Sequence, residues 1–520
     1  SSFQDSGDSD IWIENGGGNL AGNWQDGTFG FQTLLHEIGH SLGFKHPHSA
    51  FNNPSGWYSP PMVSEYDAQY WSVMAYRDYV GDELKPSLDG FDHQHEYLGC
   101  GICGSLNHSV LDSSSQMETK NGDAIYPYTP MFFDIYASLY LYAYNKDTGV
   151  YEIPENNSGD DTYTISGPVN FTIYDTDGTD TLDFTILDLN SEINLDAPLS
   201  FIGTDEINYD DGEFYTGYIV SIFFYNDMEN VNAGGGRDTI TCNIAVNTIN
   251  CGPGPDTVNA ISAGDIIYGE VGNDTFVISD FSFNLIDGGA GIDRLDLTNQ
   301  AADGSDIDLA VFDDSQIRDV EEISLLNDNI STLIKLTKDS ILNFNSSRAS
   351  DQDGDGDVDN LFYVLGDSKQ DFVSLLSAEG WTYFKTENSY DWYQSSDGDV
   401  YFATTSEMGV YEISNNSQIT VDNLSLIENI VNAKIGSVVI SDFNQLSQNS
   451  TLNYVLSGED SDKFEIDASG NLILKTGTVA DFETKNTYQI SISVLGVSKN
   501  IEITVIDSAE NKITGSSSSQ

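Results

Sequence analysis

Basic residues are scarce in this chain of 520 residues, which has only 19 Lys and Arg against 83 Asp and Glu. The formal net charge of −64 predicts a surface that repels nucleic acid and anionic membranes and attracts cations. Long apolar runs are missing as well: no stretch reaches the roughly 18 residues that a membrane-spanning helix needs. These absences argue against nucleic acid as a partner and against a transmembrane segment.

Cysteine is also rare, with four residues in the chain. Cys100 and Cys103 form a lone C-x-x-C in a glycine-rich loop. Without a second pair, we interpret them as a local disulfide or as free thiols and not as a zinc knuckle. Cys242 and Cys251 are nine residues apart in a repeat described below, which would place them on opposite edges of that repeat. We therefore predict that they are not bonded to each other.

The composition favours packed β structure over disorder despite the acidic excess. The chain has 28 Tyr and 26 Phe, and Val and Ile alternate with polar residues in many short runs. Such residues are typical of pleated, half-buried strands. The length allows three or four domains. The sequence therefore predicts a multidomain, mostly β protein.

A metal-ligand pattern occupies residues 36–46, which read H-E-x-x-H-x-x-G-x-x-H. His36 and His40 share one face of a predicted helix, and Gly43 allows the chain to turn and present His46. Three neutral imidazoles beside the Glu37 carboxylate predict a catalytic zinc site with an open fourth position. A chance match is disfavoured because the motif fixes five positions and uses three of only seven His.

The residues around this motif support a helix followed by a turn. Apolar residues at spacings of three and four predict one packed helical face, formed by Phe31, Leu34, Leu35, Ile38 and Leu42. Downstream, Ser72–Tyr76 reads S-V-M-A-Y. The extended zincin motif is typically followed by a methionine turn, and Met74 is the candidate for it.

With this motif, this turn and the segment Thr129–Tyr142, the chain resembles the serralysin branch of the metzincin metalloproteases. The resemblance implies a partial α+β metzincin catalytic domain over residues 1–155, closed by a helix in that last segment. It also implies that Met74 lies beneath the zinc and that Tyr76 is both an additional zinc ligand and a catalytic group that stabilises the oxyanion. Residues 10–14 would form the strand along which an extended peptide lies.

The implied activity is that of a zinc endopeptidase, secreted to the extracellular space or the cell surface, that cleaves extracellular proteins. Its partners would be protein or peptide substrates, with Glu37 as the general base. Serralysins carry further strands and a long helix before residue 10, and these have no counterpart in this sequence. We expect a separate N-terminal fragment or a neighbouring subunit to complete the catalytic sheet.

Glycine and aspartate recur at a fixed interval in the next segment, residues 156–300. Four stretches approximate G-G-x-G-x-D and end at Asp238, Asp256, Asp274 and Asp293, with Asn247 and Asp265 midway between them. The resulting period of nine predicts a parallel β-roll in which Asp238, Asp256, Asp265, Asp274 and Asp293 bind Ca²⁺. The half-turn at Asn247 lacks glycines, so we expect some sites not to bind calcium.

The same register predicts the core of the roll and a calcium locus before it. An apolar residue two positions after each turn should point inward, which selects Ile240, Ile249, Val258, Ile267, Phe276 and Leu295. Upstream, Gly159–Tyr163 and Gly178–Asp183 resemble the serralysin junction between protease and roll. That resemblance implies a further calcium site there.

Residues 301–410 are predicted to form a β-rich domain and contain an acidic loop. The loop matches the first nine positions of an EF-hand, with Asp351, Asp353, Asp355, Asp357 and Asp359 as candidate calcium ligands. Position twelve is Phe362 where an EF-hand has glutamate. A dockerin-like or incomplete calcium loop and a solvated acidic turn without metal are both open.

Residues 411–508 alternate with period two in short strands, which predicts a β-sandwich. The segment resembles a cadherin-like repeat. By that resemblance four acidic residues would gather at one pole and bind calcium, namely Glu428, Asp481, Glu483 and Asp507. The serine-rich residues 509–520 are expected to be a flexible tail.

Two functions are open at this point. The zinc motif favours an endopeptidase stabilised by calcium-binding repeats. The large share of calcium-dependent β modules favours instead a calcium-rigidified extracellular adhesive, matrix or filament subunit that carries a protease-derived module. A purely structural module would have no need of the Glu37 carboxylate.

Overall fold

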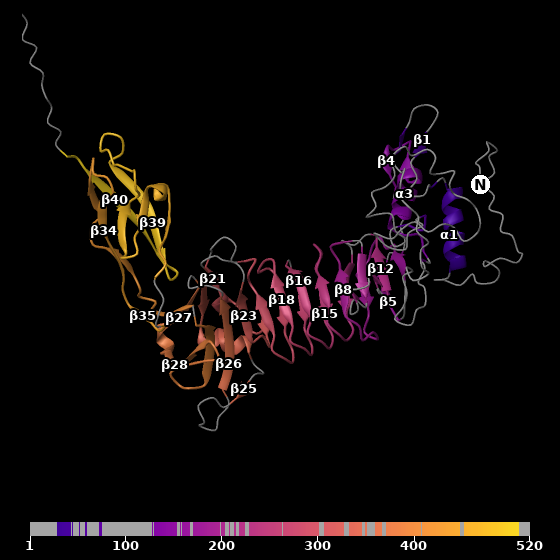
Figure 1. The fold of residues 1–520 in the computed structure, drawn as a ribbon, viewed down its shortest axis with the longest axis horizontal. Coiled ribbons are helices and arrows are strands. Elements are labelled where there is room, and N and C mark those ends of the chain that lie inside the picture. Colours follow the sequence, from indigo (N-terminus) through magenta and orange to yellow (C-terminus); the bar gives the residue numbers. More distant parts are fainter. Residues whose placement is uncertain are drawn as a thin grey trace, which may run out of the picture. The chain divides into compact units, whose positions relative to one another are not determined.

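The computed structural model of the chain is shown in Figure 1. Its residues form two compact units, 1–293 and 294–520. The described residues are 29–42, 44, 51–52, 58–59, 72–74, 127, 129–152, 157, 159–166, 170–197, 199–202, 207–208, 213–214, 218–223, 228–262, 264–300, 306–326, 332–345, 349–350, 359–366, 371–406, 408–447 and 452–508. Strands far outnumber helices in them, so the predicted mostly β class is confirmed.

The first unit begins with two helices and short hairpins. The elements are α1 (Phe29–Ser41), β1 (Phe51–Asn52), β2 (Tyr58–Ser59), α3 (Phe132–Tyr142), β3 (Tyr144–Asn145) and β4 (Val150–Tyr151). Helix α3 begins where the backbone N–H of Met131 donates to Asp134 Oδ2 over 2.8 Å. Neither helix is long and apolar enough to cross a membrane, and the same holds for every helix among the described residues.

The predicted packed face of α1 is partly wrong. Ile38 and Leu42 are 37% and 39% exposed. The buried residues of this helix are instead Gln32, His36 and Gly39. The buried stripe is rotated because the helix packs on residues 72–74 with its histidine side, where Val73, Met74 and Met131 form a small core with Leu35 and Phe44.

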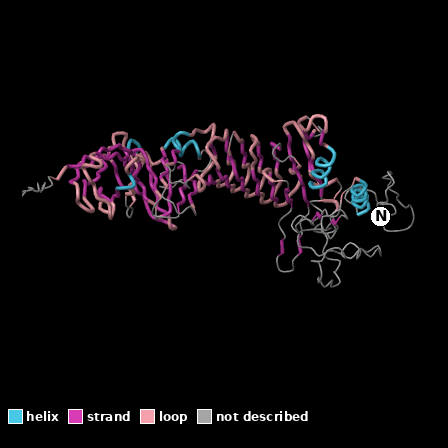
Figure 2. Tube along the Cα trace, turned by 90° about the horizontal axis from the view of Figure 1, so that it is seen from above, coloured by secondary structure: helices cyan, strands magenta, loops and turns pink. Residues whose placement is uncertain are grey.

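A two-sheet parallel roll follows, with the strands stacked side by side (Figure 2). One sheet of this unit contains β5 (Thr162–Thr164), β7 (Asp180–Asp183), β13 (Met228–Asn232), β15 (Thr248–Asn250), β17 (Ile266–Tyr268) and β19 (Leu285–Asp287). The other contains β6 (Asn170–Ile173), β8 (Ser191–Asn194), β9 (Leu199–Ile202), β12 (Tyr218–Ile222), β14 (Thr239–Thr241), β16 (Thr257–Ile261) and β18 (Thr275–Ile278). A separate hairpin pairs β10 (Ile207–Asn208) with β11 (Glu213–Phe214).

The register of the roll confirms the predicted repeat. From β12 to β19 consecutive strands alternate between the sheets, whereas β9 pairs antiparallel with β8 and β12 in one sheet. Thr239 pairs with Thr257, which pairs with Thr275. These turns take 18 residues each, twice the period of nine, and the turn from Ile266 to its partner Leu285 takes 19. All six residues predicted to point inward have an exposed fraction of 0%: Ile240, Ile249, Val258, Ile267, Phe276 and Leu295.

Glycine is required where successive turns stack. A Cβ atom at Gly254 would lie 1.5 Å from the carbonyl oxygen of Gly236, and one at Gly272 would lie 1.6 Å from that of Gly254. No side chain fits at such distances, so these backbones approach each other only because both positions are glycine.

The two cysteines of the roll are free thiols, as predicted. Cys242 follows β14 and Cys251 follows β15, and both side chains are buried. Burial raises the pKa of each thiol well above its ordinary value, so both are inert packing groups at neutral pH. Cys100 and Cys103 lie outside the described residues.

The second unit starts with wider parallel turns. One sheet contains β20 (Arg294–Asp296), β23 (Glu322–Leu325), β26 (Asp359–Gly366) and β30 (Val400–Thr405), extended by the hairpin β28 (Thr382–Glu387) and β29 (Tyr390–Gln394). The other contains β21 (Ile307–Asp308), β24 (Leu333–Leu336), β27 (Phe372–Leu376) and β31 (Gly409–Ile413). Between them lie η4 (Leu309–Val311), β22 (Ile317–Arg318), α4 (Lys338–Phe344), β25 (Ala349–Ser350) and η5 (Ser377–Glu379).

The predicted sandwich closes this unit. Its sheets contain β32 (Ile419–Val421), β34 (Lys434–Ile440), β38 (Asn471–Leu474) and β37 (Phe464–Ile466) on one side, and β33 (Ser425–Ile427), β40 (Val497–Ile506), β39 (Thr487–Val494) and β36 (Val455–Ser457) on the other. Strand β35 (Phe443–Gln445) pairs back onto β31, and η6 (Ser461–Lys463) precedes β37. Leu333, Phe372 and Tyr411 of the wider turns share one buried core with the sandwich residues.

The core of the roll can be tested with a matched pair of isoleucines. Ile249→Ala removes a side chain with 0% exposure and should destabilise the roll by about 2–5 kcal/mol. Ile244→Ala removes one that is 80% exposed and should change stability by less than about 0.5 kcal/mol. Chemical denaturation in saturating calcium measures both. Equal effects from the two substitutions would contradict the register.

Candidate metal centres

Two of the predicted zinc ligands lie on α1 with one nitrogen of each ring engaged by the backbone. Nδ1 of His36 lies 2.8 Å from the carbonyl oxygen of Val73, and Nδ1 of His40 lies 3.1 Å from that of Phe44. A carbonyl can only accept, so Nδ1 carries a proton in each ring, and Nε2 is the nitrogen through which a neutral ring would bind a metal. The ring centroids are 4.8 Å apart. Both rings are thus prepared as neutral metal ligands.

The other predicted members of this centre are only partly covered by the structure. Glu37 lies next to His36 on the exposed side of the helix. Met74 is buried, with 1% exposure, against the start of the motif. A Cβ atom at Gly39 would lie 2.3 Å from the Met74 sulfur, so the helix needs glycine there to accept the methionine. His46 and Tyr76 lie outside the described residues.

A residue that the sequence reasoning did not single out connects this site to α3. Asp134 is 3% exposed and accepts hydrogen bonds from Ser72 Oγ at 2.6 Å and from Val73 N at 2.8 Å. Its Oδ2 also accepts from Met131 N. Burial raises the pKa of Asp134 to about 6, against the lowering effect of these bonds. The sequence signal for Asp134 was its position as an acidic residue in the first turn of the helix expected within Thr129–Tyr142.

Asp134 therefore positions His36 indirectly. The carboxylate fixes the backbone of Ser72 and Val73, and the carbonyl of Val73 in turn orients the imidazole of His36. The outer face of α3 has no comparable role, since Tyr136 is 58% exposed.

The turns of the roll carry the predicted calcium residues as a buried column. Asp238, Asp256, Asp274 and Asp293 are at most 1% exposed. The backbone N–H of each of the first three donates to Oδ1 of the next, over 2.7–2.8 Å. Oδ2 of Asp256 and of Asp274 has no hydrogen-bond partner among the described residues. Buried, unpaired carboxylate oxygens fit a hard cation such as Ca²⁺.

The predicted junction locus contains three clustered aspartates. Carboxylate oxygens of Asp161, Asp175 and Asp180 all lie within 4.8 Å of one another. Tyr163 Oη donates to Asp175 over 2.5 Å, and burial raises the pKa of Asp180 to about 6. The parallel pairing of Thr162 with Thr181 shows that this locus lies on the first turn of the roll. The separation of 19 residues between Asp161 and Asp180 was the signal in the sequence.

The pole predicted in the sandwich is brought together in part by the structure. Carboxylate oxygens of Glu428, Asp481 and Glu483 lie within 4.8 Å of one another. Glu428 is 2% exposed and accepts from Phe482 N at 2.9 Å and Ser508 N at 2.7 Å, which lowers its pKa. Asp507 lies beside it. These oxygens are suitable for a divalent cation.

The acidic loop before β26 cannot be placed in the same way. Asp351, Asp353, Asp355 and Asp357 lie outside the described residues, and of Asp359 only the backbone at the start of β26 is described.

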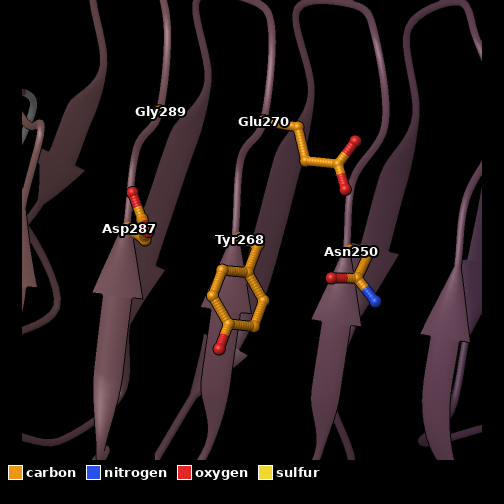
Figure 3. Close-up of a pocket in the computed structure, with 5 residues that line it drawn as sticks. All are labelled: Asn250, Tyr268, Glu270, Asp287 and Gly289. Atoms are coloured by element: carbon orange, nitrogen blue, oxygen red, sulfur yellow. The ribbon is translucent and has the colours of Figure 1, made fainter.

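A shallow hollow of about 230 Å³ lies on the outer face of β15, β17 and β19, lined by Asn250, Tyr268, Glu270, Asp287 and Gly289 (Figure 3). Glu270 occupies a position where the neighbouring turns have glycine, and it keeps the same left-handed backbone, with φ of 67° against 82° at Gly252 and 87° at Gly289. Its side chain extends over the sheet toward Asn250. The turn thus keeps its conformation despite the missing glycine.

Asp134 gives a test of how the histidine site is held. Asp134→Ala leaves the buried N–H groups of Val73 and Met131 without an acceptor, at about 1–3 kcal/mol each, and should weaken zinc binding about 10–100-fold. Asp134→Asn, which keeps one acceptor oxygen, should weaken it less. Competition with a chromophoric chelator measures the affinity. Tyr136→Phe on the exposed face is the control, and unchanged affinity in Asp134→Ala would refute this role.

Among curated proteins, the chain is similar to bacterial metalloproteases. It is 30% identical over 229 residues to serralysin of Photorhabdus laumondii subsp. laumondii, covering 42% of this chain and 38% of that protein. It is 28% identical over 227 residues to metallopeptidase AprA of Pseudomonas marginalis, covering 42% and 39%. Serralysin of Proteus mirabilis is 27% identical over 228 residues, covering 43% and 37%. The chain thus spans less than two fifths of the length of these relatives.

The other two comparisons add little. No protein-family model matches the chain. Among solved structures, human protocadherin-24 EC1-2 is 24% identical, covers 18% of this chain and 43% of its own, and has a TM-score of 0.14. Protocadherin gamma B7 cadherin domains 1–4 are 14% identical, cover 23% and 32%, and have a TM-score of 0.14. These scores carry no argument about the fold. Over the matched part, the chain is similar to serralysin-type metalloproteases.

Proposed function

We propose that the chain is a secreted zinc endopeptidase that acts on extracellular proteins and whose β modules are stiffened by calcium. The observation that carries this proposal is the pair of histidines on α1, each with Nδ1 engaged by a backbone carbonyl. In this proposal Nε2 of each ring binds the same metal, and Glu37 follows His36 on the helix. The similarity to serralysins over 42% of the chain supports the same class of activity.

In the proposed mechanism His36, His40 and His46 hold the metal. When bound, zinc would supply Lewis-acid polarisation of the scissile carbonyl and activation of a water molecule. Glu37 accepts the proton of the attacking water and delivers it to the leaving amine. Tyr76 donates a hydrogen bond to the oxyanion, and Met74 packs beneath the ligand helix. Asp134 keeps the ring of His36 oriented throughout.

A second function is favoured by the second unit. The wider turns and the sandwich share one core, and three carboxylates gather where the chain leaves β40. A stiff, calcium-binding β body of this kind suits an extracellular adhesive, matrix or filament subunit, in which the histidine site would be a protease-derived module. Substitution of Glu37 separates the two functions.

Glu37→Ala should leave zinc content unchanged and reduce cleavage of casein by at least about 100-fold, because a positioned general base contributes about 10²–10⁴-fold. Ser41→Ala, at the end of the same helix, should retain activity. Zinc is measured by elemental analysis, and cleavage by release of labelled peptide. If the wild-type chain binds zinc but cleaves nothing that the variant spares, the endopeptidase proposal fails and the structural function is favoured.

The buried aspartates predict how stability depends on pH. Burial raises the pKa of Asp274 to about 7 and that of Asp256 to about 6, from an ordinary value of 3.8. Because these pKa values are higher in the folded chain, the metal-free roll binds more protons than the unfolded chain. Its stability should fall as the pH rises from about 4 through 7. Calcium replaces the protons and should remove this loss.

Thermal unfolding between pH 5 and 8, in EDTA and in calcium, checks this expectation. The melting temperature in EDTA should decrease with pH, and the increase that calcium produces should grow with pH. Asp274→Asn should flatten the dependence in EDTA. A melting temperature in EDTA that is constant or rises over this range would contradict the assignment.

A further inference from the structure

The roll has two edges, and they differ in chemistry. The glycine edge consists of the turns that end at Asp238, Asp256, Asp274 and Asp293. The asparagine edge consists of the turns that end at Asn247, Asp265 and Asn284. Every turn ends with Asp or Asn directly before a strand, so the period of nine alone marks both edges equally as calcium sites.

On the glycine edge, the protein leaves carboxylate oxygens unsatisfied. Asp256 and Asp274 are each 1% exposed, and each uses Oδ1 to accept a backbone N–H while Oδ2 has no hydrogen-bond partner among the described residues. The stacked glycines bring backbone carbonyls close to the column, since Gly272 lies directly against the carbonyl of Gly254. In the ionised form, buried carboxylate oxygens beside carbonyl oxygens need a cation such as Ca²⁺ nearby.

The glycine edge keeps this form even where its sequence departs from the repeat. Glu270 holds the left-handed backbone of the glycine it replaces, and its side chain extends over the outer face of the sheet toward Asn250 (Figure 3). The interior of the turn before Asp274 is therefore unchanged.

On the asparagine edge, backbone N–H groups already donate to both oxygens of the corresponding carboxylate. Asp265 Oδ1 accepts from Asn247 N and Oδ2 accepts from Ser262 N, both over 2.8 Å. The two oxygens of this carboxylate are thus both occupied. Its main-chain carbonyl accepts in addition from Asn284 N at 2.9 Å.

The amide group of Asn247 is held entirely by hydrogen bonds within the protein. Its Nδ2 donates to the carbonyl of Glu229 at 3.1 Å and to Asn243 Oδ1 at 3.0 Å, while its Oδ1 accepts from Asn243 N at 3.1 Å. Asn247 is 0% exposed. An amide supplies donors to buried oxygens without any net charge, so these oxygens need no cation.

We propose that the roll is one-sided: it binds calcium along the glycine edge only, while the asparagine edge is closed by protein hydrogen bonds and takes no metal. This inference rests on the proposed calcium function of the roll and is independent of the protease activity. It removes Asp265 from the calcium ligands that the repeat period predicts.

Calcium binding by matched aspartate variants of the full chain tests the proposal. Native mass spectrometry and equilibrium dialysis with calcium alone count the bound ions. Asp274→Asn should bind at least one ion fewer than the wild type. Asp265→Asn should bind the same number, although it should melt at a lower temperature at every calcium concentration because its amide faces Ser262 N.

Two further variants keep the test decisive if Asp265→Asn does not fold. Asp280→Asn changes an exposed carboxylate of the asparagine edge and should leave the count unchanged. Asp256→Asn on the glycine edge should lower it. Loss of an ion in Asp265→Asn or Asp280→Asn would overturn the one-sided roll. An unchanged number of bound calcium ions in both Asp274→Asn and Asp256→Asn would overturn calcium binding at the glycine edge itself. The outcome of the Glu37→Ala cleavage assay is independent of both results.

Discussion

Electrostatic repulsion among buried carboxylates is the constraint on which the roll depends. Asp238, Asp256, Asp274 and Asp293 stack at most 1% exposed, in a chain whose formal net charge is −64. Apolar residues fill the interior between the sheets, but their burial requires the turns to stack, and stacking brings the carboxylates together. Without protons or cations, the same geometry that buries the core opposes its own formation.

Short, direct contacts connect the first turn of the roll to the histidine site. Strand β6 of the roll is connected to the start of α3, where Thr172 N donates to Thr129 Oγ1 over 2.8 Å. Thr172 Oγ1 also contacts the sulfur of Met131. From there Asp134 fixes Val73, whose carbonyl orients His36. The junction aspartates lie on the same first turn, so they and the histidines of α1 belong to one packed region.

The sequence predicts those features that a strict spacing determines. The roll, its inward column and the free state of Cys242 and Cys251 all follow from the period of nine, because a two-sheet roll allows one orientation at each position. The helix that carries His36, His40 and Glu37 follows from the eleven-residue motif in the same way, while the roles of these three residues stay a prediction. Asp265 shows the limit, since its carboxylate occupies a repeat position while Ser262, three residues earlier and outside the pattern, uses one of its oxygens.

Features set by tertiary packing could not be predicted in this way. The exposure of Ile38 and Leu42 depends on where residues 72–74 contact α1. The parallel turns of the second unit have unequal lengths, so no fixed period marks them, and Asp134 acts on residues that precede it by about 60 positions in the chain.

The two chemically distinct edges also limit how the roll can change length. A gain or loss of 18 residues adds or removes one complete turn and leaves each edge facing its own kind. A change of nine would bring a turn like that ending at Asn247 beside one like that ending at Asp256. A side chain would then lie where the backbone of Gly254 contacts the carbonyl oxygen of Gly236. Insertions and deletions in this roll should therefore be accepted in whole turns and rejected in halves.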